Sequence, residues 1–499
     1  MRDTLAKLID DPRSAEPAII SLEPALSITY RDLAEASERL AAELAARGLR
    51  PGDCAAMFLP NSLEFIELFL ALTRLGITVA PLNPAFRVEE LKASLMDNRA
   101  RALLARAGDA TAAEAARELG VQLWSPELDA RGAVTLDGAT PRSLGAPPPP
   151  AADQAALLLQ TSGSTGRPKM VPLTQANLLA SALDIAAHYA LSPADRTLLV
   201  MPLFHGHGLI GAALSTLSSG GTLIVPPRFS AASFWSAFQA YGATWYTAVP
   251  TIHLVLLARA DGDGAPYHGP RFIRSCSASL APAVLGKLEE RFGAPVIEAY
   301  GMTETTHQAA SNPLPPRPHK PGSVGLPTGV EIAIIDPTGK RLGANQAGEV
   351  IVRGPKVMTG YRDNPRANLE AFMDGWFRSG DMGVCDADGY LTLTGRLKEL
   401  INRGGEKIAP NEIEATLLRD SAVAEASVFG MPDPKYGEVV WAAVVLKGDT
   451  DAARLKRLCR EYLADFKVPV EIRFVAALPR NATGKVVRRD VAAMFRAAG

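Results

Sequence analysis

The chain has 499 residues, too many for one core of ordinary size, so we expect two or more domains. Its 52 basic and 53 acidic residues give a formal net charge of −1, which argues against a nucleic acid or an anionic membrane as a partner. Hydrophobic residues make up 47% and charged residues 21%, the profile of a soluble globular protein. The most apolar stretch, residues 63–72, contains Glu64 and Glu67, which excludes a membrane span and favours a buried helix.

The ends of the chain and its cysteines bear on location. The start lacks the long apolar region of a secretory signal and the end lacks a peroxisomal tripeptide, so we expect a cytoplasmic protein. The sequence leaves open whether it is a monomer or a homodimer. No cysteine lies in a C-x-x-C pair, so we expect reduced, mostly buried thiols rather than disulfides or a zinc site at Cys54, Cys276, Cys385 and Cys459.

The first 145 residues alternate helical and strand patterns. Residues 30–47 carry apolar side chains at helical spacing, residues 54–59 form a short apolar strand, and Ser62 is placed to cap the next helix. This alternation indicates a mainly parallel sheet covered on both faces. Four consecutive prolines, residues 147–150, then form a stiff connector.

A segment suited to phosphate follows the connector. After the apolar run 155–159, residues 160–169 contain two glycines, four hydroxyl residues, one Arg and one Lys. Glycine lets the backbone approach an anion, while amides, hydroxyls and cationic side chains stabilise its oxygens. The spacing is not that of the P-loop, because Pro168 precedes Lys169 and Met170 follows it. Taken alone, the segment is also compatible with an ordinary turn.

Further strand-like runs alternate with helical patterns such as residues 282–291. Ligands of open α/β sheets lie at the carboxyl ends of the strands, so the segments after these runs are candidates for the site. Four of the seven histidines fall there: His205, His207, His253 and His307. The runs are residues 197–203, 221–225, 243–249, 272–276 and 295–299.

The pattern changes twice in the last third of the chain. Residues 322–383 are short alternating strands with glycine-rich turns, which predicts a small β-rich part. From about Lys398 to the end we expect a small α+β domain without internal repeats. Its helices are predicted at 412–418 and 451–466, and its strands at 424–429, 439–446 and 471–475.

Residues 161–171, TSGSTGRPKMV, resemble the phosphate loop of the adenylate-forming superfamily, which contains acyl-CoA synthetases, peptide-synthetase adenylation domains and firefly luciferase. Further motifs of that family follow in order at residues 300–304, 375–381, 395–399 and 479–489. The resemblance implies an α/β fold with two domains. The larger, residues 1–396, would contain parallel-sheet α/β subdomains and the β-rich part, and the smaller, residues 397–499, would be a mobile α+β domain.

The resemblance also implies ATP and Mg²⁺. Chemistry on ATP needs a carboxylate for the metal and a hydroxyl near the α-phosphate. Glu304 and Thr165 would hold the metal, Thr303 would contact the phosphate, and Tyr300 would stack on adenine. Asp381 and Arg396 would bind the ribose, although Asp381 is also compatible with a plain turn. The expected nucleotide-binding residues are Thr161, Ser162, Gly163, Ser164, Thr165, Gly166, Lys169, Ser277, Ala278, Ser279, Glu298, Ala299, Tyr300, Gly301, Met302, Asp381 and Arg396.

In the C-terminal domain, the resemblance implies a catalytic lysine, a hinge and access for coenzyme A. Lys485 would bridge the acid carboxylate and the α-phosphate, although most lysines are simply solvated surface residues. Lys398 would be the hinge at which the small domain rotates. The tunnel for the CoA thiol would be bordered by Gly404, Gly405 and Glu406, where the two glycines are equally compatible with a hairpin turn.

Residues 201–208, 243–253, 274–280 and 395–407 resemble, more narrowly, the oxalate–CoA ligases of plants and fungi. Gly301 departs from the plant enzymes, which have Ala there. An acid with a second carboxylate needs partners for that charge inside the pocket. We expect His205, His207, His253, Ser277 and His307 to supply donors, with Ser279 nearby and His205 also acting in catalysis. Any one of the histidines is also compatible with a structural role.

These features predict a ligase that forms an acyl-adenylate and then an acyl-CoA from an acid, ATP and coenzyme A. Oxalate is the preferred acid, and malonate or another short or medium-chain acid is the alternative. Two alternative functions remain: loading an acid onto a carrier protein, and oxygenation like that of luciferase. A regulator that binds nucleotide without catalysis would be expected to lack Lys485 or Glu304, and both are present.

Overall fold

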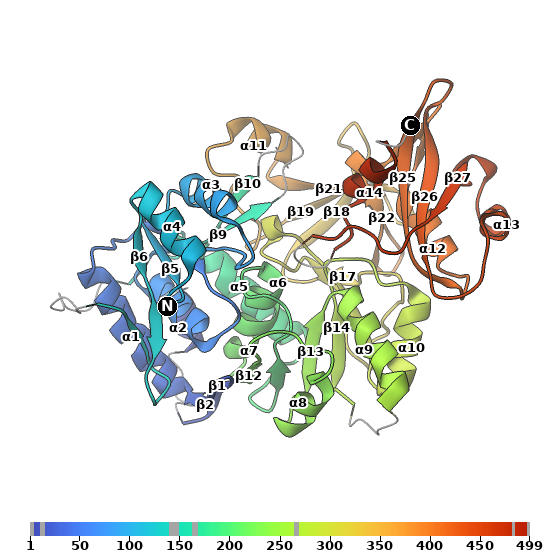
Figure 1. Ribbon diagram of the computed structural model, residues 1–499. Coiled ribbons are helices and arrows are strands. Elements are labelled where there is room, and N and C mark those ends of the chain that lie inside the picture. The colour runs from blue at the N-terminus through green and yellow to red at the C-terminus, as the bar shows by residue number, and fades with distance from the viewer. Residues whose placement is uncertain are drawn as a thin grey trace.

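The computed structural model describes residues 4–9, 15–138, 149–161, 168–263, 269–481 and 485–496. Figure 1 shows a large part, coloured blue to yellow, and a smaller orange and red part at the upper right. The predicted α/β fold with a large N-terminal and a small C-terminal domain is confirmed.

The sheet with the most strands in the described part of the chain has nine. Its central strands are parallel, and β2, β16 and β17 are antiparallel at the two edges. Parallel strands place their carboxyl ends together, so the segments after β11, β13, β14 and β15 meet at one edge. In spatial order the strands are β17 (Leu326–Pro327), β16 (Ala310–Ser311), β15 (Val296–Tyr300), β14 (Phe272–Ser275), β13 (Trp245–Ala248), β11 (Arg196–Leu198), β12 (Thr222–Val225), β1 (Pro17–Leu22) and β2 (Ala25–Thr29).

A second sheet of six strands is parallel except for β10 at its edge. Lys169 at the start of β10 pairs with Thr161 at the end of β9, so the predicted phosphate loop connects these two strands. The strand predicted at residues 54–59 is β3. The strands in order are β10 (Lys169–Thr174), β9 (Ala155–Thr161), β4 (Thr78–Pro81), β3 (Cys54–Phe58), β5 (Ala102–Ala105) and β6 (Gln122–Trp124).

Helices pack against these two sheets, as α3 does on β3 and α10 on β15. The helical predictions for residues 30–47 and 282–291 are confirmed by α1 and α10. The strand predicted at residues 197–203 is shorter than expected, because β11 ends at Leu198. The helices are α1 (Tyr30–Ala46), α2 (Leu63–Arg74), α3 (Val88–Asn98), α4 (Ala110–Leu119), α5 (Gln175–His188), α6 (Gly206–Gly208), α7 (Ser215–Ser218), α8 (Phe234–Ala240), α9 (Pro250–Asp263) and α10 (Pro282–Phe292), with a 3₁₀ turn at Leu5–Leu8.

Helix α2 shows how local sequence specifies an element. The hydroxyl of Ser62 accepts a hydrogen bond from the N–H of Phe65 and caps the helix, as predicted. Glu67 is fully buried within the helix, where one of its oxygens accepts from the N–H of Val134 at 3.1 Å. Burial raises the pKa of Glu67 to about 7, because the charged form loses its hydration.

The predicted β-rich part is an antiparallel sheet that lies between the α/β sheets and the C-terminal domain (Figure 1). It runs further along the chain than residue 383, because its last strand reaches Arg396. A short hairpin of β7 (Pro126–Leu128) and β8 (Val134–Leu136) lies apart from it. The sheet contains β18 (Glu331–Ile335), β19 (Gly348–Arg353), β20 (Phe372–Met373), β21 (Trp376–Cys385) and β22 (Leu391–Arg396), with α11 (Pro365–Ala371) beside it.

The C-terminal domain has a separate sheet and its own hydrophobic core. A 3₁₀ turn, Leu397–Glu399, separates it from β22, and the division at residues 396 and 397 stays a prediction. The helix predicted at 451–466 ends at Tyr462, followed by a 3₁₀ turn at Asp465–Lys467. The elements are β23 (Ile401–Arg403), β24 (Glu406–Ile408), α12 (Pro410–Leu417), β25 (Val423–Asp433), β26 (Gly437–Leu446), α13 (Ala452–Tyr462), β27 (Glu471–Phe474) and α14 (Arg488–Arg496).

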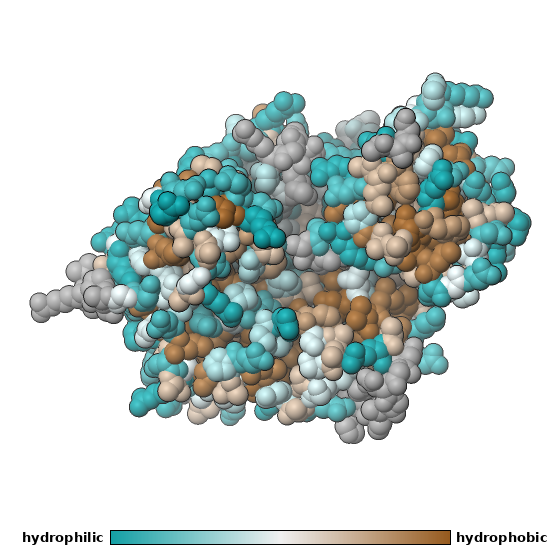
Figure 2. All heavy atoms as spheres, in the orientation of Figure 1, coloured by the Kyte–Doolittle hydropathy of each residue, from teal (hydrophilic) through white to brown (hydrophobic). Residues whose placement is uncertain are grey.

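The surface is mixed in character. Figure 2 shows hydrophilic residues over most of the drawn face, with hydrophobic residues gathered on the C-terminal domain. Among the described residues, no helix is both long enough and apolar enough to cross a membrane. The four cysteines are free thiols, and three of them are buried.

Candidate functional site

Segments that follow neighbouring parallel strands meet at one edge of the nine-stranded sheet. His205 and His207 come after β11, Ser277 comes after β14, and His307 comes after β15. The rings of His207 and His307 stack with centroids 5.1 Å apart, and Nδ1 of His207 lies 3.1 Å from Oγ of Ser277. His205 caps α6 by accepting a hydrogen bond from the N–H of His207. Three of the four predicted histidines and Ser277 therefore lie together.

A buried arginine lies behind these histidines. Arg274 on β14 is fully buried, and its Nη1 donates to Oγ1 of Thr247 at 2.9 Å while its Nη2 donates to Nε2 of His307 at 3.0 Å. Thr247 Oγ1 also lies 2.6 Å from Nε2 of His207. Arg274 therefore binds the ring of His307 directly and is linked to the ring of His207 through the hydroxyl of Thr247. We call Arg274, Thr247, His207, Ser277 and His307 the acid cluster.

Burial keeps the histidines of this region neutral. Desolvation lowers the pKa of His205 to about 4, and the nearby charge of Lys485 adds to the effect. Desolvation also lowers the pKa of His207 well below its usual range, followed by repulsion from His307 and Arg274. The pKa of His307 is also lowered, first by burial and second by repulsion from Arg274. Neutral imidazoles act here as hydrogen-bond partners with one donor and one acceptor nitrogen each.

Two glycines leave room for His307. A Cβ on Gly211 would lie 2.3 Å from Nε2 of His307, and a Cβ on Gly301 would lie 1.5 Å from its carbonyl oxygen. Gly211 belongs to a π-helical segment, Leu209–Leu214, a rare form that is frequently found at functional sites. His307 itself has a φ of 81°, a left-handed conformation that non-glycine residues adopt at a cost. The backbone around His307 is thus shaped for one side-chain position.

His253 lies close enough to the acid cluster to contribute to the lowered pKa of His207, but no hydrogen bond joins its side chain to a side chain of the cluster among the described residues. It is fully buried on α9, where its ring packs against Tyr246 at 5.6 Å and its Nδ1 lies 3.4 Å from the tyrosine hydroxyl. Nε2 of His253 has no hydrogen-bond partner within the described ranges. Burial lowers its pKa to about 4. Its predicted contact with the acid stays a prediction.

A second group of polar residues lies between the two domains. Tyr300 at the end of β15 is buried, and its hydroxyl donates to Asp381 Oδ2 at 2.6 Å. Asp381 on β21 also pairs through Oδ1 with Nε of Arg396 at 2.9 Å. Arg396 is half exposed and ends β22, next to the predicted hinge. We call Tyr300, Asp381, Arg396 and Lys485 the nucleotide cluster.

Lys485 is the member of this cluster from the C-terminal domain. Desolvation and repulsion from Arg396 lower its pKa to about 8, and attraction to Asp381 opposes the shift. Its charge in turn lowers the pKa of His205. The residue is nevertheless exposed to solvent. Lys485 therefore lies where the histidines and the nucleotide cluster come nearest to each other.

Glu304 and Lys169 are linked by a tyrosine that sequence reasoning did not identify. The hydroxyl of Tyr361 donates to Oε1 of Glu304 at 2.8 Å, and Nζ of Lys169 lies 4.4 Å from the centre of its ring. Thr303 begins the 3₁₀ turn that contains Glu304. Thr161 ends β9 beside Lys169. The predicted positions Ser162, Gly163, Ser164, Thr165 and Gly166 fall outside the described residues.

The remaining predicted nucleotide-binding residues lie around this region in different environments. Glu298 is buried and accepts a hydrogen bond from the N–H of Gly322 at 2.8 Å, and burial raises its pKa to about 7. Ala299 is buried, and Gly301 and Met302 are half-buried. In the loop after β14, Ala278 and Ser279 are exposed, and Ser277 has a φ of 71°. Their roles stay predictions.

The residues predicted to form the hinge and to border the thiol tunnel lie along the start of the C-terminal domain. Lys398 is exposed within the 3₁₀ turn between β22 and β23. Gly404 and Gly405, with φ values of 60° and 99°, turn the chain from β23 into β24, and Glu406 begins β24. The two glycines form a hairpin turn. Their place beside a CoA tunnel stays a prediction.

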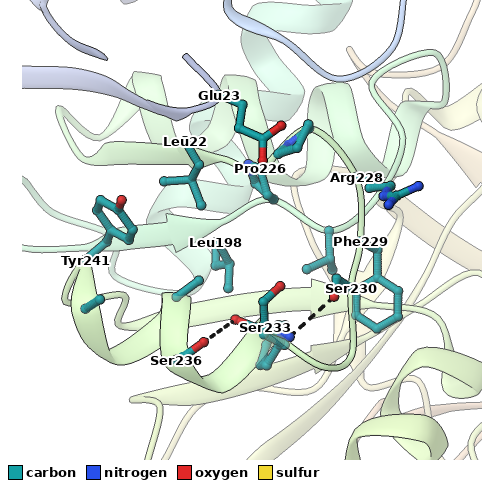
Figure 3. Close-up of a pocket in the computed structure, with 15 residues that line it drawn as sticks. Leu22, Glu23, Leu198, Pro226, Arg228, Phe229, Ser230, Ser233, Ser236 and Tyr241 are labelled. Carbon is teal, nitrogen blue, oxygen red and sulfur yellow. Dashed lines mark hydrogen bonds between the residues drawn. The ribbon is translucent and has the colours of Figure 1, made fainter. Parts of the chain in front are cut away.

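A pocket of about 470 Å³ lies elsewhere, between the end of β1, the segment after β12 and α8 (Figure 3). It is lined by residues such as Leu198, Arg228, Ser233 and Tyr241, and by none of the predicted site residues. Its position away from the histidines and the nucleotide cluster argues against it as the place of reaction.

Arg274, Thr247 and Tyr361 were missed from the sequence. Arg274 and Thr247 lie inside strands, where a polar residue in an apolar run was the available signal. A buried cation needs partners, so an arginine within the run 272–276 was informative. Tyr361 lies between motifs and offered no comparable signal.

Comparison with known sequences identifies the class. Residues 11–362 match the AMP-binding enzyme family and residues 412–485 match the AMP-binding enzyme C-terminal domain. The chain belongs to the AMP-binding enzyme family.

Particular relatives narrow the class. An oxalate–CoA ligase of Arabidopsis thaliana is 46% identical over 99% of this chain and 99% of its own length. A sulfoacetate–CoA ligase of Cupriavidus necator is 41% identical over 97% of both chains. Among solved structures, the o-succinylbenzoate–CoA synthetase MenE of Bacillus subtilis in complex with ATP and magnesium ion is 30% identical, with a TM-score of 0.86 over 98% of this chain and 99% of that one.

Proposed function

We propose that this protein is an AMP-forming acid–CoA ligase whose acid is oxalate. The acid cluster supports the choice of acid, because a fully buried arginine and two neutral histidines suit a small acid with a second negative group. Lys485 acts on the neighbouring His205. The 46% identical oxalate–CoA ligase and the 41% identical sulfoacetate–CoA ligase support the same reasoning, since each is named for a two-carbon acid with a second anionic group.

The first half-reaction joins the acid to AMP. One carboxylate oxygen of the acid attacks the α-phosphorus of ATP, the bond from that phosphorus to the bridging oxygen breaks, and pyrophosphate leaves. Lys485 provides positive charge between the carboxylate and the α-phosphate, where negative charge accumulates. Thr303 donates to the phosphate, and Asp381 and Arg396 hold the ribose while Tyr300 packs at the adenine. His205 lies beside the reacting carboxylate.

We propose that a magnesium ion accompanies ATP. Mg²⁺ takes oxygen ligands and commonly binds one or two carboxylates together with substrate phosphates. Oε2 of Glu304 has no partner within the described ranges, and those ranges contain no cluster of three or more His, Cys, Asp or Glu side chains that would hold a metal alone. Glu304, with Thr165, therefore fits a metal shared with ATP. When bound, the ion offsets phosphate charge.

The second half-reaction forms the thioester. The C-terminal domain rotates at Lys398, which takes Lys485 away from the phosphate and brings Gly404, Gly405 and Glu406 to the path of the CoA thiol. The thiol, losing its proton, adds to the acyl carbonyl, and AMP leaves as the carbon–oxygen bond to phosphate breaks. No covalent intermediate with the protein is required. The cytoplasmic location and the choice between monomer and homodimer stay predictions.

The experiment is a comparison of acids. Purified protein with Mg-ATP and CoA is given oxalate, malonate, sulfoacetate, acetate, butyrate, octanoate, palmitate or 4-coumarate, and pyrophosphate release is measured. We expect oxalate to give the highest kcat/KM. A higher value for malonate or sulfoacetate would keep the ligase and replace the acid, and a higher value for a monocarboxylate would give the histidines a structural role.

A second experiment distinguishes a CoA ligase from an enzyme that loads a carrier protein. Acyl-CoA is followed by mass spectrometry after ATP, oxalate and CoA are supplied together. We expect oxalyl-CoA and AMP in equal amounts. Pyrophosphate release without any thioester would favour transfer to a protein-bound thiol.

A further inference from the structure

Arg274 has four hydrogen-bond acceptors and no carboxylate. Its Nε donates to the Tyr189 hydroxyl at 2.9 Å, and its Nη2 donates to Gln308 Oε1 at 2.8 Å as well as to His307. Its Nη1 donates to Thr247. No ion pair joins Arg274 to an acidic residue anywhere in the described part of the chain. Buried charges are normally paired, so this cation is left in need of an anion.

The guanidinium fixes the direction of every hydrogen bond near it. Arginine has donors and no acceptor, so Nε2 of His307 must accept from Nη2. Because His307 is neutral, its proton is then on Nδ1. Nδ1 of His307 has no hydrogen-bond partner among the residues that the structure describes, so this N–H is available to a ligand.

The same reasoning assigns the donor and the acceptor of each hydrogen bond made by Thr247 and His207. Oγ1 of Thr247 accepts from Arg274, and the residue is buried, so its own proton needs an acceptor. Nε2 of His207, at 2.6 Å, is the acceptor within reach in the described ranges. His207, also neutral, then carries its proton on Nδ1 and donates it to Oγ of Ser277 at 3.1 Å. The hydroxyl proton of Ser277 is left free to point into the site.

We propose that Arg274 is a positioning residue for the second carboxylate of the acid: it orders the protons of the acid cluster so that Ser277 and His307 both present donors, and it supplies the charge that makes the cluster select an anion. This inference rests on the proposed function and adds to it the residue that sets acid specificity. Arg274 itself is too deeply buried to be counted among the substrate contacts.

The packing around His307 supports this arrangement. The stacked rings of His207 and His307 hold each other in plane, and Gly211 leaves the space that the ring of His307 needs to reach Nη2. A lysine in place of Arg274 would keep the charge but could not serve the four acceptors, since its donors radiate from a single nitrogen rather than from a planar fork. The cluster therefore depends on the geometry of arginine as well as on its charge.

The first test compares two acids of the same shape. Oxamate replaces the second carboxylate of oxalate by a neutral amide, so the ratio of kcat/KM for oxalate to that for oxamate reports selection of the charge. We expect Arg274→Gln and Arg274→Lys to lower kcat/KM for oxalate by about 10- to 100-fold, the range for one hydrogen bond to a charged group, with most of the change in KM. For oxamate we expect less than about 5-fold, since its amide gains nothing from the charge.

Arg271→Gln is the matched control. Arg271 lies three residues earlier, donates to the backbone oxygen of Tyr189 and pairs with Asp195 at 2.9 Å, but contacts no member of the acid cluster. We expect this variant to lose stability without changing the ratio of the two acids. An equal loss for oxalate and oxamate in the Arg274 variants would assign Arg274 a purely structural role and overturn the inference.

The second test observes the wild-type protein and does not depend on the identity of the acid. Wild-type protein labelled with ¹⁵N-histidine is examined by NMR at pH 7.5, with His207→Gln and His307→Gln used for assignment. We expect both histidines to be neutral and protonated on Nδ1. Protonation of either ring on Nε2 would overturn the proposed order of protons. If wild-type protein used neither oxalate nor another diacid, the proposed function would fail, and these spectra would still decide the proton order.

Discussion

The acid cluster and the nucleotide cluster lie on either side of His205 and are built differently. All members of the acid cluster except Ser277 are buried, all come from the N-terminal domain, and a chain of side-chain hydrogen bonds links them. The nucleotide cluster combines buried Tyr300 and Asp381 with exposed Arg396 and Lys485, and Lys485 comes from the other domain. The first cluster is formed by the N-terminal domain alone, and the second needs Lys485 from the C-terminal domain.

This difference separates two properties of the enzyme. A preformed, buried cluster fixes which acid fits, because its groups cannot rearrange without leaving polar atoms unpaired. A cluster shared between domains can be assembled for one half-reaction and dispersed for the next. Changes in the first should therefore alter the choice of acid, and changes in the second should alter one chemical step.

The largest effect is expected from Lys485→Ala. In the proposed mechanism the lysine supplies positive charge at the transition state of adenylation, so we expect that step to slow by on the order of 10²- to 10³-fold, the size seen when one preorganised donor is removed. Attack of CoA on supplied acyl-adenylate should remain largely intact, because the proposed domain rotation takes Lys485 away before that step. Both half-reactions are measured separately, by pyrophosphate release and by thioester formation.

Lys447→Ala, an exposed lysine of the same domain at the end of β26, is the control and should change neither step. Loss of both half-reactions in Lys485→Ala would contradict a nucleotide cluster that serves adenylation alone.

The next effect concerns the acid cluster and needs no change in any polar group. Gly211→Ala places a Cβ 2.3 Å from Nε2 of His307, which forces the ring away from Arg274. We expect kcat/KM for oxalate to fall by about 10-fold or more and the protein to lose about 1–3 kcal/mol of stability, the usual cost of overpacking. The kinetic constants and the thermal midpoint check this.

Gly286→Ala is the matched substitution, because Gly286 is exposed on α10 with no atom near its Cβ position. It should leave activity unchanged and add about 0.5–1 kcal/mol of stability through helix propensity. If Gly211→Ala kept full activity with oxalate, the fixed position of His307 would not be needed.

Much of the framework followed from the sequence because the signals were local. The cap at Ser62, the helix 30–47 and the strand at residues 54–59 depend on neighbours in the chain, and the structure has all three. The grouping of His205, His207, Ser277 and His307 followed from one topological rule, that parallel strands end together. The strand predicted at 197–203 was too long, because an apolar run does not show where a partner strand stops pairing.

The part of the site that could not be predicted depends on contacts between distant residues. Arg274 reaches Tyr189, 85 residues away, and Tyr361 reaches Glu304, 57 residues away. His253 also follows a strand, and its ring packs on Tyr246, so its predicted contact with the acid stays a prediction. Side-chain direction within a helix was not visible from the pattern.

The pH dependence of kcat/KM for adenylation distinguishes the two clusters. Burial keeps His205 neutral above about pH 4, and it lowers the pKa of His207 and His307 as well, so none of them should titrate near pH 6.5. Lys485, with its pKa lowered to about 8, is protonated below that value and loses its charge above it. We therefore expect kcat/KM for adenylation to be level between about pH 6 and 8 and then to fall towards tenfold per pH unit.

Lys485→Arg is the control for that profile, because arginine stays charged throughout the range. Its activity should be lower but level up to about pH 9.5. The same decline above pH 8 in this variant would place the titrating group elsewhere. An inflection near pH 6.5 in the wild-type enzyme would contradict neutral, buried histidines in the acid cluster.

The smallest effect is expected where the nucleotide site meets the phosphate loop. Tyr361→Phe removes the hydrogen bond to Oε1 of Glu304 and keeps the ring that Lys169 lies over. One such bond contributes about 0.5–1.5 kcal/mol, so we expect KM for Mg-ATP to rise by about 2- to 10-fold with kcat little changed. Tyr361→Leu also removes the ring and should raise KM further, because the cation–π contact is lost. Titration of Mg²⁺ at fixed ATP separates the two contributions. The phenylalanine variant should need more magnesium, because Glu304 loses the hydroxyl that orients its carboxylate. An unchanged magnesium requirement would mean that the 3₁₀ turn, rather than Tyr361, orients Glu304.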